Sequence, residues 1–322
     1  MTTDEWFRYF LSFFYPIFFC VCIFIQSVLF YTLFFHSPKN LSTMRYFIGN
    51  TCIFQMILVS TTCFSLFRMV SDKAPVEIRV YGPARHYPAL VGFILFETLQ
   101  TCTLTSHMSI MATFYLKFEA VRSFDLKSRR IKFNLFLIQM PVFASLIAEI
   151  ATICVAQLPE EMQLYYAALN KDNLVYTVVG SGLQTLASTI NVAITSGTSF
   201  TVPIVSYLMR RSILLHINSH LDRSSHMKKL HNKLFVTGLT IQVIIPLVTY
   251  TPIFAVYYYC IVTHEVLYAH QYFMCLVPAI PSLCDPCVAL WFVAPYRKKI
   301  KTWLKLEKSS TMVVPREHSS GT

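Results

Sequence analysis

Three carboxylates and one histidine lie inside long runs of apolar residues in this sequence. They are Glu97, His107, Glu149 and Asp285. An ionisable side chain among apolar residues is costly, so it is by default a candidate for a ligand site, an ion path or a conformational switch. Pro286 directly follows Asp285 and removes a backbone hydrogen-bond donor, so the sequence predicts a helix bend beside this acid.

The sequence motifs that identify common enzyme classes are absent. There is no Gly-Lys-Ser/Thr phosphate loop, no His-Glu-x-x-His and no Gly-x-Ser-x-Gly. Cys284 and Cys287 have a metal-ligand spacing, but they lie inside an apolar run, where packing is the favoured role. Cys260 and Cys275 bracket a short segment and are close enough in sequence to pair, although spacing alone does not give connectivity. We predict a protein that is not an enzyme and holds no metal or cofactor.

The apolar runs that surround these groups are long enough to cross a membrane. Of the 322 residues, 55% are hydrophobic and only 13% are charged, against about 25% charged in a soluble domain. A helix needs about 20 apolar residues to span the bilayer core. We therefore predict an all-α membrane protein, a bundle of seven transmembrane helices. The predicted spans are Tyr9–Phe35, Tyr46–Phe67, Ala89–Leu116, Phe133–Leu158, Thr185–Met209, Leu234–Tyr259 and Tyr272–Ala294.

The basic residues are distributed unequally between the two sides of these spans. The segments on one side carry 21 Lys and Arg, and those on the other side carry six. Because Lys and Arg accumulate in cytoplasmic loops, the N-terminus is predicted to lie outside and the C-terminal tail in the cytoplasm. This asymmetry accounts for most of the net charge of +11 without a nucleic-acid partner. Residues 68–88 are unusually basic for an outer loop.

One face of the third span gathers polar side chains. Glu97, Gln100, Leu104, His107 and Met111 recur at intervals of three and four, so they share a helix face. Glu97 and Gln100 lie in the predicted outer half, where a ligand from outside would reach them. The alternative is that Glu97 is a protonated or paired structural group.

A short amphipathic helix is predicted after the last span. Ile300, Trp303 and Leu304 recur at helical spacing among basic residues, which is typical of a helix that lies on the cytoplasmic leaflet. The predicted organisation is a seven-transmembrane domain over residues 1–308 and a disordered cytoplasmic tail over residues 309–322.

The last span carries the most distinctive motif. Residues 278–286 read PAIPSLCDP and are followed by Trp291-Phe292 and Pro295-Tyr296-Arg297. Tyr15-Pro16 follows a short N-terminus, and His107 precedes Phe114-Tyr115-Leu116-Lys117-Phe118 at the end of the third span. In these features the chain, from Phe10 to Lys305, resembles the nematode serpentine chemoreceptors, which are receptors of the G-protein-coupled type. The most similar class is serpentine receptor class delta, within the str-like superfamily. Lys117 stands where that family usually has Arg.

The resemblance implies a chemosensory receptor in the plasma or ciliary membrane of sensory neurons. It implies an odorant-like or pheromone-like small molecule as ligand and a heterotrimeric G protein as cytoplasmic partner. The expected ligand-binding residues are Glu97, Gln100, Gln184, Tyr257 and Tyr258. The expected switch residues are His107, Lys117, Pro252, Asp285, Pro286 and Tyr296, and the expected G-protein-facing residues are Arg122, Arg210, Arg211, Lys228 and Lys229.

Two other classes of function stay open at this point. A seven-span transporter or ligand-gated channel would use Glu97, Glu149 and Asp285 as proton or cation relays. A structural membrane protein would respond to no stimulus. Electrical recording separates the first alternative from a receptor, because channel currents persist when G-protein signalling is blocked.

Overall fold

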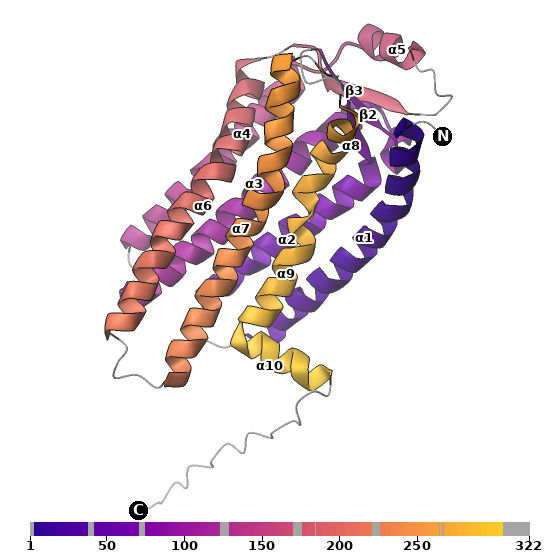
Figure 1. The fold of residues 1–322 in the computed structure, drawn as a ribbon. Coiled ribbons are helices and arrows are strands. Elements are labelled where there is room, and N and C mark those ends of the chain that lie inside the picture. The colour runs from indigo at the N-terminus through magenta and orange to yellow at the C-terminus, as the bar shows by residue number, and fades with distance from the viewer. Residues whose placement is uncertain are drawn as a thin grey trace, which may run out of the picture.

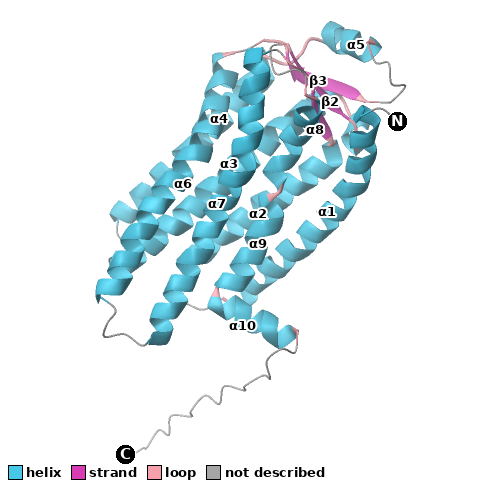
Figure 2. Cartoon of the chain, in the orientation of Figure 1, coloured by secondary structure: helices cyan, strands magenta, loops and turns pink. Residues whose placement is uncertain are grey.

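The chain folds into a helical bundle, as predicted. The computed structural model describes residues 3–37, 42–70, 75–122, 129–169, 176–183, 185–220, 226–263, 265 and 267–304. In these residues seven helical segments are long and apolar enough to cross a membrane (Figure 1, Figure 2). The first six are α1 (Thr3–Phe35), α2 (Ser42–Ser65), α3 (Ala89–Arg122), α4 (Arg129–Val155), α6 (Leu186–His220) and α7 (His226–Thr263).

The seventh span, predicted over Tyr272–Ala294 with a bend beside Asp285, is broken into separate helical pieces. It consists of α8 (Tyr268–Leu276), a 3-10 turn (Val277–Ala279) and α9 (Pro281–Phe292). Pro278 and Pro281 stand at the break, and each lacks the backbone N–H that an unbroken helix would use. The start at Tyr272 was therefore wrong by four residues, and the prolines interrupt the helix as well as bend it.

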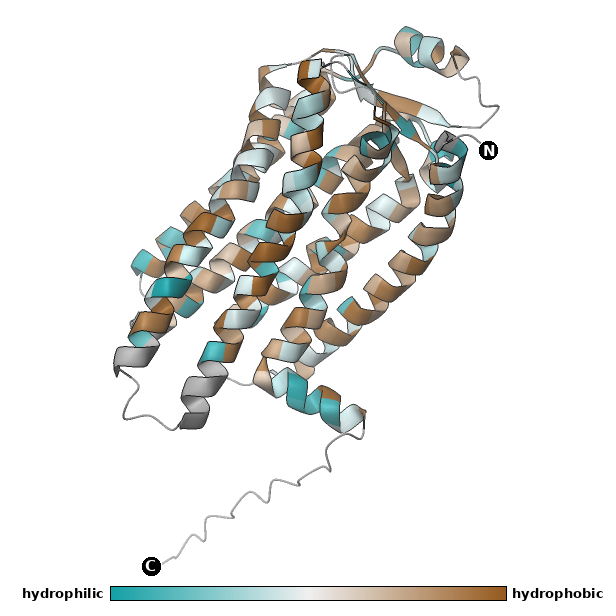
Figure 3. Ribbon diagram, in the orientation of Figure 1, coloured by the Kyte–Doolittle hydropathy of each residue, from teal (hydrophilic) through white to brown (hydrophobic). Residues whose placement is uncertain are grey.

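The two ends of the bundle differ in structure. The N-terminus, the strands and the short helix α5 (Glu160–Ala168) lie at one end, and α10 (Ala294–Trp303) lies across the other (Figure 1). We call these the sheet end and the α10 end. Apolar residues run along the bundle helices and hydrophilic residues gather on α10 (Figure 3). Phe13, Phe24 and Ile147 are 71%, 69% and 69% exposed, as expected for side chains that face lipid. The protein is an integral, multi-pass membrane protein.

A three-stranded antiparallel sheet at the sheet end was not predicted. Its strands are β1 (Phe67–Met69), β2 (Val76–Val80) and β3 (Thr177–Ser181), in the order β1-β2-β3. Ile78 pairs with Met69 on one side and with Val179 on the other. β1 packs against α8 and β3 packs against α3, so the sheet covers this end of the bundle. The segment over residues 68–88 is therefore largely structured rather than a free basic loop.

The predicted amphipathic helix at the other end is confirmed as α10. Trp303 lies against Tyr31 and His36, with both ring centroids 5.9 Å away. Tyr296 is fully buried, and its hydroxyl lies 3.0 Å from the hydroxyl of Ser37. Burial raises the pKa of Tyr296, so the phenol stays protonated at neutral pH. These contacts fasten α10 to the end of α1.

The cysteines contribute packing and no disulfide. All ten are among the described residues and none is joined in a disulfide, so the possible Cys260–Cys275 bond is not formed. The predicted tail over residues 309–322 lies outside the described residues.

Candidate functional site

A large cavity lies inside the sheet end of the bundle. Its volume is about 440 Å³, and its walls come from α3, α6, α7, α8 and the sheet. Val76 and Ile78 of β2 and Met69 of β1 close it at the end. A cavity of this size matches the usual range for small-molecule sites. The aromatic part of its wall consists of Phe93, Phe96, Tyr250, Phe254, Tyr257 and Tyr258.

Four of the five expected ligand-binding residues line this cavity. They are Glu97 and Gln100 of α3 and Tyr257 and Tyr258 of α7. Gln184, the fifth, lies outside the described residues. The structure brings the four residues to one space, and their role in binding stays a prediction.

Glu97 and Gln100 belong to a hydrogen-bonded cluster that reaches two further helices. The Gln100 amide donates to Glu97 Oε2 at 3.4 Å, and Asn191 of α6 donates to Gln100 Oε1 at 3.2 Å. Asn191 also lies 3.5 Å from Oε1 of Glu149, which is 2% exposed. Buried polar groups need such partners because desolvation is otherwise uncompensated. The cluster therefore links α3, α4 and α6 beside the cavity.

The second acid of this cluster is better satisfied than the first. Glu149 accepts hydrogen bonds from Thr101 of α3 and from Ser145, one turn earlier on α4. It does not line the cavity, whereas Glu97 does. Both acids were predicted from the sequence, whereas Asn191 and Thr101 were not, because a partner on another helix does not alter the residue spacing of either helix.

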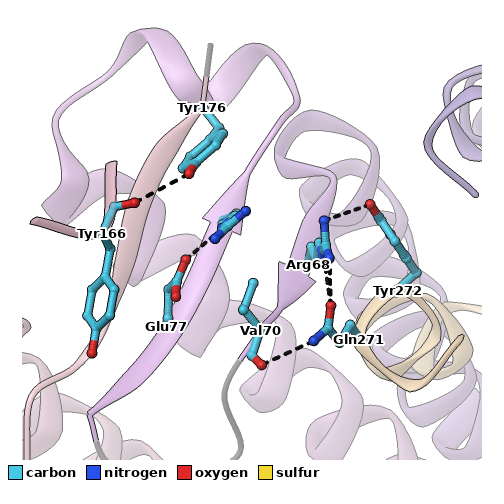
Figure 4. A network of polar contacts seen from close by, with 8 residues as sticks. Arg68, Val70, Glu77, Tyr166, Tyr176, Gln271 and Tyr272 are labelled. Carbon is cyan, nitrogen blue, oxygen red and sulfur yellow. Dashed lines mark hydrogen bonds and ion pairs between the residues drawn. The ribbon is translucent and has the colours of Figure 1, made fainter. Parts of the chain in front are cut away.

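Arg68 fastens the sheet over the cavity. Its guanidinium donates to Gln271 Oε1 at 2.9 and 2.8 Å and to the Tyr272 hydroxyl at 3.0 Å (Figure 4). Gln271 in turn donates to the carbonyl of Val70 at 3.2 Å. Arg68 is only 5% exposed, so these contacts form in a low-dielectric region, where they are strong. We call Arg68, Val70, Gln271 and Tyr272 the latch.

The basic residues that looked anomalous for an outer loop are explained by such pairing. Arg79 donates to Glu77 at 2.6 Å on β2, and its guanidinium lies 4.8 Å from the centre of the Tyr176 ring (Figure 4). Burial alone would lower the pKa of Arg79, but the hydrogen bond and charge of Glu77 raise it. Two of the four basic side chains in residues 68–88, those of Arg68 and Arg79, thus make structural contacts.

Replacing Arg68 with methionine tests the latch. We expect the variant to lose about 2 kcal/mol of stability, since it removes hydrogen bonds from a charged donor. Amide exchange in β1 should rise because α8 no longer holds the strand. Arg85→Met is the control, since among the described residues the Arg85 side chain donates only to the Tyr81 carbonyl and to His86, both at 3.3 Å. Equal exchange in β1 for the two variants would contradict the latch.

His107 lies on α3 beyond the cavity, toward the α10 end. Its ring is 5.2 Å from the ring of Tyr250, which lines the cavity and donates to the carbonyl of Pro278 at 3.2 Å. His107 also borders a small void of about 10 Å³ between α3, α6 and α7. A movement of Tyr250 would therefore alter its contact with His107 and its hydrogen bond to Pro278 at the break in the seventh span.

Asp285 lies in a second, separate polar cluster. Gln55 of α2 donates to Asp285 Oδ2 at 2.5 Å, and Gln242 of α7 donates to the Asp285 carbonyl at 3.1 Å. Gln26 of α1 donates to Gln55 at 2.8 Å and to the Ser282 carbonyl at 2.8 Å. This glutamine cluster joins four helices. Among the described residues no hydrogen bond connects it directly with the cluster around Glu149.

The remaining predicted switch residues lie in different surroundings. Lys117 is half-buried, with Nζ 5.2 Å from the centre of the Phe235 ring. Pro286 is buried beside Asp285 and borders a void of about 20 Å³, whereas Pro252 is exposed on α7. Tyr296 holds α10. Pro252 can act only through the backbone of α7, because its ring points away from the bundle.

The predicted G-protein-facing residues lie toward the α10 end. Arg211 is exposed and Arg210 half-buried on the last turns of α6. Arg122 is the last residue of α3, and Lys228 and Lys229 lie in the first turn of α7. The side chains of the last three are outside what the structure describes. Within the described residues no group of three His, Cys, Asp or Glu is arranged to hold a metal ion.

The chain is similar to one family over nearly its whole length. Residues 11–302 match the family model described as serpentine type 7TM GPCR chemoreceptor Srd. Serpentine receptor class delta-40 of Caenorhabditis elegans is 40% identical, with 93% of this chain and 94% of that protein covered. Class delta-47 of the same organism is 36% identical (94% and 96% covered), and class delta-45 is 34% identical (96% and 97% covered).

Proposed function

The chain belongs to the serpentine receptor class delta family, and from this premise we propose that it binds a small organic molecule in the sheet-end cavity and signals to a heterotrimeric G protein. Family membership makes it a chemosensory receptor of the G-protein-coupled type. We further propose that it acts in the plasma or ciliary membrane of sensory neurons. The ligand would be odorant-like or pheromone-like.

The observation that carries this proposal is the cavity itself. It measures about 440 Å³ and combines an aromatic wall with a few polar groups, which is the usual composition of a small-molecule site. The polar groups gather on α3 and α6, and the aromatic groups lie mainly on α3 and α7. A ligand between these helices would contact elements that reach the α10 end.

We propose that the sheet end faces outward. The Lys and Arg excess lies at the α10 end, which the positive-inside rule assigns to the cytoplasm. The hydrophilic face of α10 then meets the cytoplasmic leaflet, and a ligand reaches the cavity from outside or from the outer leaflet. Glycosylation tags placed in the segment before β3 and after α10 would test this orientation.

Ligand binding would favour one arrangement of the bundle over another. A ligand shifts a conformational equilibrium only through contacts that differ between the two states. Tyr250 provides such a contact, because it lines the cavity and also touches His107 and the Pro278 carbonyl. The seventh span is broken at Pro278, so a small shift there can change how α9 lies against α7.

A ligand screen in cells expressing the chain, with a calcium readout, tests the receptor function. We expect a responding ligand whose signal is weakened several-fold by Arg210→Glu with Arg211→Glu, because these charges face the proposed G-protein surface. The matched control reverses two charges at the opposite end, Glu160→Lys with Glu161→Lys on α5. Equal signals from both double variants would contradict the proposed coupling surface.

The same cells distinguish the receptor from a channel or transporter. Ligand-evoked currents that persist under blocked G-protein signalling would overturn the proposal. Glu97→Gln combined with Gln100→Ala should reduce ligand potency, since both side chains line the cavity. Unchanged potency in that variant would place the ligand elsewhere.

A further inference from the structure

We propose that the sheet-end cavity takes a positively charged ligand, a protonated amine with an apolar body, and that Glu97 is its counter-ion. The inference rests on the proposed function, since it names the chemical class of the ligand for the same cavity. It comes from the position of one buried acid at the edge of a large cavity whose described lining residues include no basic side chain.

Glu97 is buried but incompletely satisfied by the protein. It is 5% exposed and lines the cavity. Among the described residues its one hydrogen-bond donor is the Gln100 amide, at 3.4 Å, which is a long contact. Burial of a carboxylate is expensive unless the charge is paired and hydrogen-bonded. Glu149, by comparison, receives hydrogen bonds from Thr101, Ser145 and Asn191.

The described part of the cavity wall contains no cation that could pair with Glu97. The described residues that line it include no Lys, Arg or His. Arg68 lies close by on β1, but its guanidinium is directed to Gln271 and Tyr272, and it is not part of the wall. We infer that the ligand supplies this positive charge, so that the Glu97 carboxylate is ionised and paired when the site is filled.

The rest of the wall suits an organic cation. Phe93, Phe96, Tyr250, Phe254 and Tyr257 surround the space, and aromatic faces attract ammonium groups through the ring quadrupole. A neutral ligand would gain the same apolar contacts, but it would leave Glu97 either protonated or unpaired. The shape of the site matches an amphiphile, with its charged head at α3 and α6 and its apolar body toward α7.

Matched probes that share one hydrocarbon body test the charge. We would use octylamine, octanol and octanoate, and 3-phenylpropylamine with its alcohol and carboxylate, on the purified full chain in lipid nanodiscs. Affinity is read from the rise in unfolding temperature with probe concentration. For at least one body, the amine should bind the wild type at least about tenfold more tightly than the alcohol, as a charge-assisted hydrogen bond provides.

Variants of the acid then separate binding at Glu97 from partition into lipid. Glu97→Gln should weaken amine binding about ten- to hundredfold and leave alcohol binding unchanged, which also shows that the variant is folded. Glu97→Asp should keep the preference for the amine. Glu77→Gln is the control, since Glu77 is a buried acid at the same end that does not line the cavity.

Each outcome decides the charge of the ligand. Amines that bind no better than alcohols, tighter binding of a carboxylate, no binding of any probe, or an unchanged amine affinity in Glu97→Gln would overturn the inference. Calcium responses to alcohols alone would leave the receptor function standing and remove the amine. Amine binding without any G-protein activation would support the amine ligand and contradict the receptor function.

Discussion

Replacing Gly180 with alanine is expected to lower the free energy of unfolding by about 3 kcal/mol, one of the two largest effects expected here. Gly180 has a φ of +140°, a conformation that residues with a Cβ rarely adopt. An added Cβ would also lie 2.0 Å from the carbonyl oxygen of Val76 on the neighbouring strand. The backbone fixes the positions of both the added Cβ and the Val76 carbonyl oxygen, so the pairing of β2 with β3 must open.

The loss should extend to the ligand site, because β2 contributes Val76 and Ile78 to the cavity wall. Unfolding temperature and surface expression in cells measure the effect. Gly197→Ala is the matched control, since a Cβ at this position on α6 meets nothing within 4 Å. That change should be neutral or stabilise by about 0.5–1 kcal/mol. If Gly180→Ala keeps the wild-type unfolding temperature, the sheet does not form as described.

The bundle could be predicted from the sequence because each span carries its own evidence. An apolar run of sufficient length crosses the membrane whatever its neighbours do. The helix ends were less predictable: α3 continues to Arg122 and α7 begins at His226, both beyond the apolar core. Intrahelical hydrogen bonds continue into water, so loss of hydrophobicity marks the membrane boundary and not the end of the helix.

The sheet could not be predicted for a related reason. β1 has three residues and β2 and β3 have five each, too few for an alternating pattern to be recognised. β3 pairs with β2 across about a hundred residues, and the local sequence of neither strand indicates its partner. β3 lies just before α6, and it becomes an edge strand only through its pairing with β2.

The residues of the candidate site were likewise predictable only in part. The spacing of Glu97 and Gln100 on α3 predicted that they share a face, and both line the cavity. Asn191, which connects them with Glu149, and Gln55, which holds Asp285, were missed. Periodicity reports which side of one helix is buried, whereas these residues matter for what they meet on another helix.

Replacing Gln55 with leucine should cost about 3 kcal/mol, the other large effect. Gln55 is 2% exposed and is the hydrogen-bond donor to the Asp285 carboxyl, at 2.5 Å. Asp285 Oδ1 is buried without a partner in the described structure, so loss of Gln55 leaves the whole carboxyl unsatisfied. The Gln26 amide would lose its acceptor on Gln55 as well. Thermal unfolding of the purified chain measures the cost.

A double-mutant cycle distinguishes this cause from simple loss of packing. Asp285→Val removes the acid, and the double variant with Gln55→Leu should lose about 2 kcal/mol less than the sum of the two single variants, because no stranded polar group remains. Thr51→Val is the control on the same helix, since Thr51 lines the 20 Å³ void together with Gln55 and Asp285, but within the described structure its hydroxyl donates only to its own helix, at the Phe47 carbonyl. Strict additivity in the cycle would show that Gln55 and Asp285 are not coupled.

The glutamine cluster also bears on how the bundle changes conformation. The double-mutant cycle measures only its Gln55–Asp285 contact. Gln242 ties α7 to α9, and Gln26 and Gln55 tie α1 and α2 to the same helix. A receptor that moves α7 against α9 must break the Gln242 contact while the other two hold α9 in place. Gln242→Leu should therefore raise signalling without ligand at a smaller cost in stability than Gln55→Leu, because it frees only a backbone carbonyl. Signalling that stays at the wild-type level in Gln242→Leu would make the cluster structural alone.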